Sequence, residues 1–178
     1  MAISKVEREF HRKFAVRCFN LTWDYLELKK RTIEDDRQML YLAHASRYHW
    51  GIVGTPRNRA IGDWQISRVY AELRHLELAL EFARSCLATC EKNNLSDIVH
   101  TANEAIARAY AVAKDYRSAR SYLNKARQQF HNLRLDKEDE KIYSDQLHDT
   151  ELFIEKERKH FSRSAERIKK MDHISADD

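Results

Sequence analysis

Turn-forming residues are almost missing from this chain of 178 residues, which holds three glycines and one proline. Average usage is about 7% glycine and about 5% proline. All four lie between Gly51 and Gly62, so the rest of the chain lacks the residues that tight turns use most often. Because sheet proteins need frequent turns, this scarcity predicts long helices joined by polar connections, and hence an all-α fold.

Long apolar runs are also missing, since none approaches the roughly 18 residues of a membrane span. The charged start of the chain, Met1 to Arg8, differs from the apolar block of a signal peptide. Charged residues make up 34% of the chain and hydrophobic ones 43%, a balance typical of a folded protein. The three cysteines leave an odd thiol, as expected in a reducing compartment. We therefore expect a cytoplasmic protein without a membrane partner.

Apolar residues recur at spacings of three and four and predict six or seven helices. The first helix is expected over residues 3 to about 30, with a break near Thr22 as an alternative. Its apolar stripe consists of Ile3, Val6, Phe10, Phe14, Cys18, Leu21, Tyr25 and Leu28. Residues suited to capping mark the starts of later helices at Thr32, Thr55, Ser96, Asp115 and Asp136. A further helix is expected over residues 76 to 92.

These helices predict one structural domain in three parts. A divergent helical hairpin covers residues 1–54, two further hairpins cover 55–134, and a capping helix with a frayed tail covers 135–178. The last helix carries a stripe that can pack on a neighbour, made up of Tyr143, Leu147, Thr150 and Ile154. It begins with acids and ends with bases, as the helix dipole favours. A solvated helix explains these charges, so we do not expect a nucleic-acid partner, although the basic end leaves that alternative open.

An internal repeat with a period of 40 residues is the most specific pattern in the chain. Its two copies match at six positions, Ile66, Ser67, Tyr70, Ala79, Phe82 and Cys86 in the first and Ile106, Ala107, Tyr110, Ala119, Tyr122 and Ala126 in the second. Small residues recur where paired helices must approach closely, and aromatic residues recur where hairpins meet. Each copy is therefore expected to be two helices joined by a short turn.

This pattern resembles the tetratricopeptide repeat over about residues 60 to 130, although that family's usual period is about 34 residues. Arg74 and Lys114 stand at the usual turn glycine, and the usual proline is missing. The segment from His44 to Trp50, with Gly62 to Gln65, also resembles small bacterial proteins of this type with no assigned role. The resemblance implies a stack of antiparallel helical hairpins, an α-solenoid, ending in the long capping helix.

The resemblance also implies a concave groove lined by the first helix of each hairpin. It places there Ile61, Trp64, Arg68 and Glu72 from one copy and Thr101, Glu104, Arg108 and Val112 from the other. We take Trp64, Arg68, Glu72, Glu104 and Arg108 as candidate ligand-binding residues. Two interpretations stay open. The arginines are neutralised internally, Arg108 by Glu104 and Arg68 by Glu72, or they bind a carboxylate or phosphate of a ligand.

No sequence motif for a cofactor or metal is present, so we predict neither, and no catalytic residue. Residue pairs that could share a metal occur at helical spacing, namely Cys86 with Cys90, His100 with Glu104, and Glu72 with His75, but none forms a His-Glu-x-x-His arrangement. We predict a non-enzymatic adaptor that binds a peptide, a protein tail or a small anionic ligand, with a homodimer left open. The alternatives are a helical ligand-binding or metal-dependent enzyme using His44, His100 and nearby carboxylates, and a nucleic-acid-associated protein.

Overall fold

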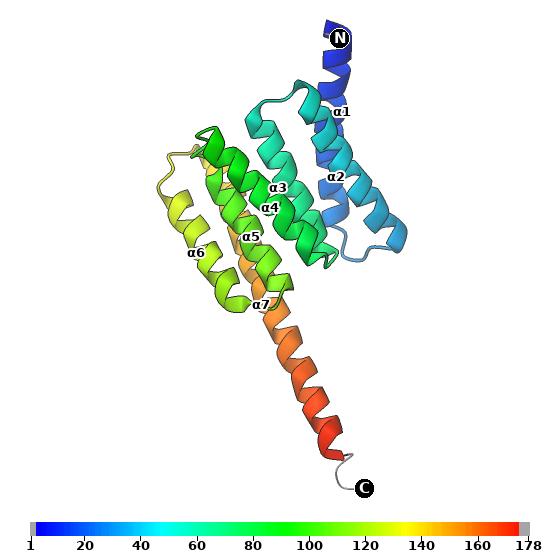
Figure 1. The fold of residues 1–178 in the computed structure, drawn as a ribbon, viewed down its shortest axis with the longest axis vertical. Helices are drawn as coiled ribbons and strands as arrows, with labels where there is room; N and C mark the ends of the chain where they lie inside the picture. The colour runs from blue at the N-terminus through cyan, green and yellow to red at the C-terminus, as the bar shows by residue number, and fades with distance from the viewer. Residues whose placement is uncertain (1–2, 175–178) are drawn as a thin grey trace.

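A computed structural model describes residues 3–174, with side chains for residues 3–162, and these form seven helices without a strand (Figure 1). The helices are α1 (Lys5–Leu26), α2 (Ile33–Val53), α3 (Pro56–Glu72), α4 (Leu76–Lys92), α5 (Val99–Val112), α6 (Tyr116–His131) and α7 (Lys137–Ile174). Three successive pairs pack as antiparallel hairpins, and α7 packs against α5 and α6. The all-α prediction is confirmed. The expected frayed tail includes residues 175–178, which lie outside the described part.

Side-chain caps fix the starts of several helices. Thr32 and Thr55 each accept from a backbone amide three residues on, and Asp115 accepts from Ser118 at 3.0 Å, as predicted. The prediction of a cap at Ser96 was wrong, because a turn occupies residues 96–98 and α5 begins at Val99. Ile98, just before α5, is fully buried, so apolar packing rather than a capping side chain fixes this start.

Helix α1 is continuous, as the main prediction has it, but it ends earlier, at Leu26. The alternative of a break near Thr22 is wrong, because the Thr22 hydroxyl donates to the Cys18 carbonyl at 2.8 Å instead of capping a second segment. Its predicted apolar stripe is also partly uncovered, with Val6, Phe10 and Phe14 exposed by 61%, 54% and 44%. The face toward α2 instead carries the fully buried Ala15, whose carbonyl accepts from the Ser46 hydroxyl at 2.9 Å. Close helix approach thus selects small residues here.

The two copies of the 40-residue repeat have equivalent local structure. Tyr70 stacks on Phe82 with ring centroids 5.8 Å apart, and Tyr110 stacks on Tyr122 at 5.6 Å. The corresponding small residues Ala79 and Ala119 are both fully buried. Helices α3–α4 and α5–α6 are therefore two versions of one hairpin.

The turns of these two hairpins are equivalent as well. Arg74 and Lys114 have φ angles of 65° and 62°, in the left-handed region that favours glycine. In each turn the next residue's amide donates to a tyrosine carbonyl, His75 to Tyr70 at 2.9 Å and Asp115 to Tyr110 at 3.1 Å. The hairpins thus close with glycine-like geometry at residues that are not glycine.

Helix α7 covers the last hairpin with its first half and extends past the bundle with its second half (orange to red in Figure 1). Three residues of its predicted stripe, Leu147, Thr150 and Ile154, are buried, together with Phe153. Leu147, Phe153 and Ile154 share an apolar cluster with residues of α5 and α6 that includes Leu123. The first half of α7 is therefore part of the core.

Candidate functional site

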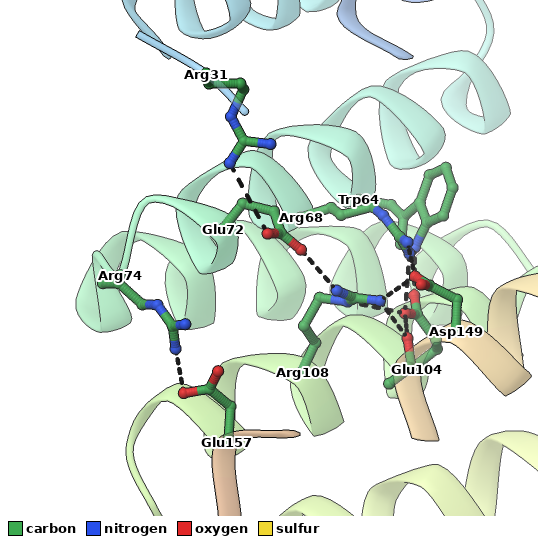
Figure 2. Close-up of polar contacts among 10 residues, drawn as sticks. Arg31, Trp64, Arg68, Glu72, Arg74, Glu104, Arg108, Asp149 and Glu157 are labelled. Atoms are coloured by element: carbon green, nitrogen blue, oxygen red, sulfur yellow. Dashed lines mark hydrogen bonds and ion pairs between the residues drawn. The ribbon is translucent and has the colours of Figure 1, made fainter. Parts of the chain in front are cut away.

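The five candidate groove residues come together in one cluster where α3, α5 and α7 meet (Figure 2). Trp64, Arg68 and Glu72 come from α3, while Glu104 and Arg108 come from α5. All but Glu72 are buried, and Arg108 is only 1% exposed. The helical spacing that predicted a shared face was correct, but this face lies inside the molecule.

Glu104 is the centre of the cluster. Its Oε2 accepts from Trp64 Nε1 at 2.6 Å, and its Oε1 accepts from the Thr150 hydroxyl of α7. The same Oε1 lies 3.4 Å from Arg68 Nη1 and 3.6 Å from Arg108 Nε. One buried carboxylate thus joins three helices and faces both guanidinium groups.

Both arginines are paired within the chain. Arg108 Nη1 donates to Glu72 Oε1 at 2.9 Å, and its Nη2 donates to Asp149 Oδ2 at 2.5 Å. Arg68 pairs with Glu104 and also donates to Asp149. The interpretation of internal neutralisation is therefore correct, with partners that differ in part from those predicted, because Glu72 pairs with Arg108 and not with Arg68.

Every arginine of the network has a carboxylate partner. Arg31 Nη2, from the α1–α2 connection, lies 3.9 Å from Glu72 Oε2, while its Nε donates to Asp36 Oδ1 at 2.7 Å, so three arginines face four carboxylates. Burial lowers the pKa of Arg68, and the positive charge of Arg108 lowers it further. Burial raises the pKa of Asp149, but Arg108 and Arg68 outweigh it and hold that pKa below its usual range. No positive charge of the cluster is left without a carboxylate.

Aromatic rings complete the surroundings of the two guanidinium groups. Arg108 Cζ lies 4.4 Å from the ring centroid of Phe153, and Arg68 Cζ lies 5.2 Å from that of Trp23. Trp23 in turn contacts Trp64 with ring centroids 5.6 Å apart. These contacts add cation–π attraction to the ion pairs and hold the guanidinium planes in place.

An open cleft of about 360 Å³ lies beside this cluster, between α1, α3 and α7. Its lining residues are Trp23, Leu26, Glu27, Arg68, Glu72, Asp145, Gln146 and Asp149. Glu72 and Asp149 are paired with arginines of the cluster, and Arg68 is paired with Glu104 and Asp149. Glu27 and Asp145 are exposed carboxylates outside that network, so the accessible part of the predicted groove is acidic.

Three residues expected in the groove lie elsewhere. Ile61 and Val112 pack against apolar clusters of the core. The buried Thr101 hydroxyl donates to the Ile98 carbonyl at 2.7 Å inside the first turn of α5. None of these three residues therefore lines the cleft.

Sequence reasoning missed four partners of the cluster, which are Trp23 from α1, Arg31 from the α1–α2 connection, and Asp149 and Phe153 from α7. Thr150 was the one residue that could have indicated the contribution of α7 to the cluster, because it was expected on the packing stripe of the last helix. Asp149 adjoins it, in an acid-rich segment that we interpreted as solvated. The spacing along one helix does not show which other helix will face it, so the contact itself was not predictable.

The histidines of the enzyme hypothesis do not converge. His44 Nε2 lies 3.1 Å from the Tyr70 hydroxyl, whereas His100 is buried between Phe130 and Tyr143. Among the described residues, no group of three His, Cys, Asp or Glu side chains is arranged to hold a metal ion. The geometry therefore offers this alternative no support.

Comparisons with protein-family models, curated protein sequences and solved structures found no match to the chain. Across the described helices, none combines the length and apolar character that crossing a membrane requires.

Proposed function

We propose that this chain is a non-enzymatic, tetratricopeptide-like interaction module whose cleft binds a positively charged segment of a partner protein. The observation that carries the proposal is that the cleft is lined by Glu27 and Asp145, two exposed carboxylates outside the arginine network. Arg68, the cation in this lining, is paired with Glu104 and Asp149, so the field at the cleft mouth favours a lysine or arginine side chain.

This proposal changes the ligand expected from the sequence. A carboxylate or phosphate would have to replace a carboxylate already bound to Arg68 or Arg108, and breaking a buried ion pair costs about 3–5 kcal/mol. A cationic side chain would meet Glu27 and Asp145 instead, which lie outside the buried cluster. Trp23 offers an aromatic ring to the same side chain.

The tetratricopeptide-like architecture is supported by the three hairpins and by the equivalence of the two 40-residue copies. In that family the first helix of each hairpin lines the concave face. The proposal identifies the cleft with this face, since α1 and α3 are the first helices of their hairpins and α7 follows the last one. A peptide lying along the cleft would contact all three helices.

The test is a titration with two short synthetic peptides that differ only in having lysine or glutamate at alternate positions. We expect the lysine peptide to shift the backbone NMR signals of cleft residues and the glutamate peptide to leave them unchanged. Binding should weaken as salt is added, because the attraction is electrostatic. Equal binding of both peptides, or shifts confined to other surfaces, would contradict the proposal.

A further inference from the structure

Helix α6 presents a strongly cationic surface that the cleft does not use. Residues 114–134 hold one acid, Asp115, against six basic residues, Lys114, Arg117, Arg120, Lys125, Arg127 and Arg134. Asp115 caps α6 and so faces the helix start. All six cations except Arg127 are exposed. This short segment therefore carries a larger positive charge than the +4 of the whole chain.

The hairpin itself does not require these cations, because α4 is the equivalent helix in the other copy of the repeat. Arg117 and His131 stand 40 residues after Glu77 and Glu91, so two acids of α4 are replaced by basic groups on α6. Both helices nevertheless pack on their partners in the same way. The positive charge of α6 is therefore not needed to form the hairpin that the two repeat copies share.

The equivalent positions also explain why the α6 surface is open. Arg120 and Arg127 stand 40 residues after Leu80 and Leu87, which pack against an apolar core cluster. On α6 the two arginines line a groove of about 200 Å³ beside α7, and the carboxylates Glu151 and Glu155 of α7 line the same groove. The two arginines therefore leave a groove between α6 and α7, whereas Leu80 and Leu87 fill the equivalent positions of α4 by packing against the core.

Few of the cations are neutralised within the described part of the chain. Arg127 pairs with Glu151 at 2.7 Å, and the Lys114 ammonium lies 5.1 Å from the ring centroid of Phe161. Among the described side chains, no carboxylate forms an ion pair with Arg117, Arg120, Lys125 or Arg134. Arg117, Arg120 and Lys125 are thus exposed cations on α6, with Lys114 just before the helix and Arg134 just after it. Exposed cations clustered along a helix are the electrostatic footprint of a polyanion site.

We propose that the cationic surface formed by α6 and the residues flanking it, namely Lys114, Arg117, Arg120, Lys125 and Arg134, binds the phosphate backbone of double-stranded nucleic acid. A helix of 16 residues is about 24 Å long. The same length of duplex presents about 14 phosphates, enough to face every cation of this surface. This site differs from the basic end of the last helix that the sequence suggested.

The side chains around this surface favour a duplex over other polyanions. No large apolar side chain is exposed on α6, which is described in full, so it lacks the residues that insert into a lipid surface. It also offers no exposed aromatic ring on which unpaired bases could stack. Contacts to the backbone alone would be independent of base sequence.

The experiment measures binding of a fluorescent duplex DNA and a duplex RNA of mixed sequence to the full chain over a range of salt concentrations. With five phosphate contacts, the logarithm of the DNA binding constant should fall against the logarithm of salt with a slope of about −4 to −5. The Arg117→Gln, Arg120→Gln variant should reduce that slope by about 2 and weaken binding roughly 10- to 100-fold near 0.1 M salt.

The matched control is Arg8→Gln, Arg12→Gln, which removes the same charge from exposed positions on α1, across the molecule from α6 (Figure 1). It should leave both slope and affinity close to those of the parent. Equal losses in the two variants, or no duplex binding at low salt, would overturn the proposal. So would binding only to phosphatidylserine vesicles, which would assign the cations to a lipid surface.

Discussion

Trp64 and Glu104 occupy the same position in the two copies of the 40-residue repeat, and they hydrogen-bond to each other, with Trp64 Nε1 2.6 Å from Glu104 Oε2. Arg68 and Arg108 are likewise equivalent, and both face Glu104 at 3.4 and 3.6 Å. The two hairpins thus share one backbone arrangement but differ in their polar side chains. At this position the first copy supplies the indole donor and the second copy supplies the carboxylate acceptor. The contact between α3 and α5 depends on this difference.

Replacing Glu104 with glutamine should test that dependence. The change leaves two buried guanidinium groups with one fewer negative charge, so we expect the free energy of unfolding to fall by about 3–5 kcal/mol. Urea denaturation provides the measurement. Glu91→Gln, at an exposed position of α4, is the control and should change stability by less than about 0.5 kcal/mol. A Glu104 variant as stable as its control would show that the cluster contributes little.

Leucine in place of Ala79 or Ala119 should overpack a helix contact. Both alanines are fully buried at equivalent places, so each substitution should cost about 1–3 kcal/mol. Ala88→Leu, on the exposed side of α4, gives the matched control. Thermal melts of the three variants would reveal the difference. If all three melted like the parent, the equivalence of the two hairpins in packing would be wrong.

A chain ending at Leu135 should be unstable or aggregate. Removing α7 exposes its apolar contacts with Leu123 and also removes Asp149 from both arginines of the cluster. Size-exclusion chromatography and a thermal melt of the shortened chain would check this expectation. A monomer with the parent's melting temperature would exclude a stabilising role for α7.

Mild acid should destabilise the fold through His100. Burial lowers the pKa of His100 to about 4, from 6.5, although the nearby carboxylates of Glu104 and Asp97 favour the charged form. Between these two pH values the unfolded chain binds a proton that the folded chain does not, so stability falls as pH decreases. The loss attributable to His100 approaches about 3 kcal/mol at pH 4.

The His100→Leu variant isolates this contribution from those of the other groups. Urea denaturation at several pH values should give a shallower decline for the variant between pH 6.5 and 4. Parallel curves for variant and parent would mean that His100 takes up its proton equally in both states.

Helices were predictable here because their signals are local. Thr32 and Thr55 cap helices through atoms within three residues, and the spacing of Leu147 and Ile154 marks one face of α7. The repeat was predictable for a similar reason, since paired small residues such as Ala79 and Ala119 recur at a fixed period. These features need no knowledge of which helices are neighbours.

The pairing of the arginines depends on such knowledge and was not predictable in detail. Arg68 and Arg108 were correctly placed on one face, but Asp149 reaches them only because α7 packs over α5. The exposure of Phe10 on α1 has the same origin, because periodicity identifies an apolar stripe without showing whether another helix covers it. Tertiary packing decides both.

The most direct test of the proposed function is a reversal of charge at the cleft. Glu27→Lys with Asp145→Lys inverts the two carboxylates that lie outside the buried cluster, so the fold should be retained. Among the described side chains, Asp145 forms its ion pair with the exposed Lys141, at 2.8 Å, and such surface pairs contribute about 0–1 kcal/mol. If the cleft binds a cationic segment, the double variant should lose the lysine peptide and bind the glutamate peptide instead. A folded variant with the parent's peptide preference would contradict the account.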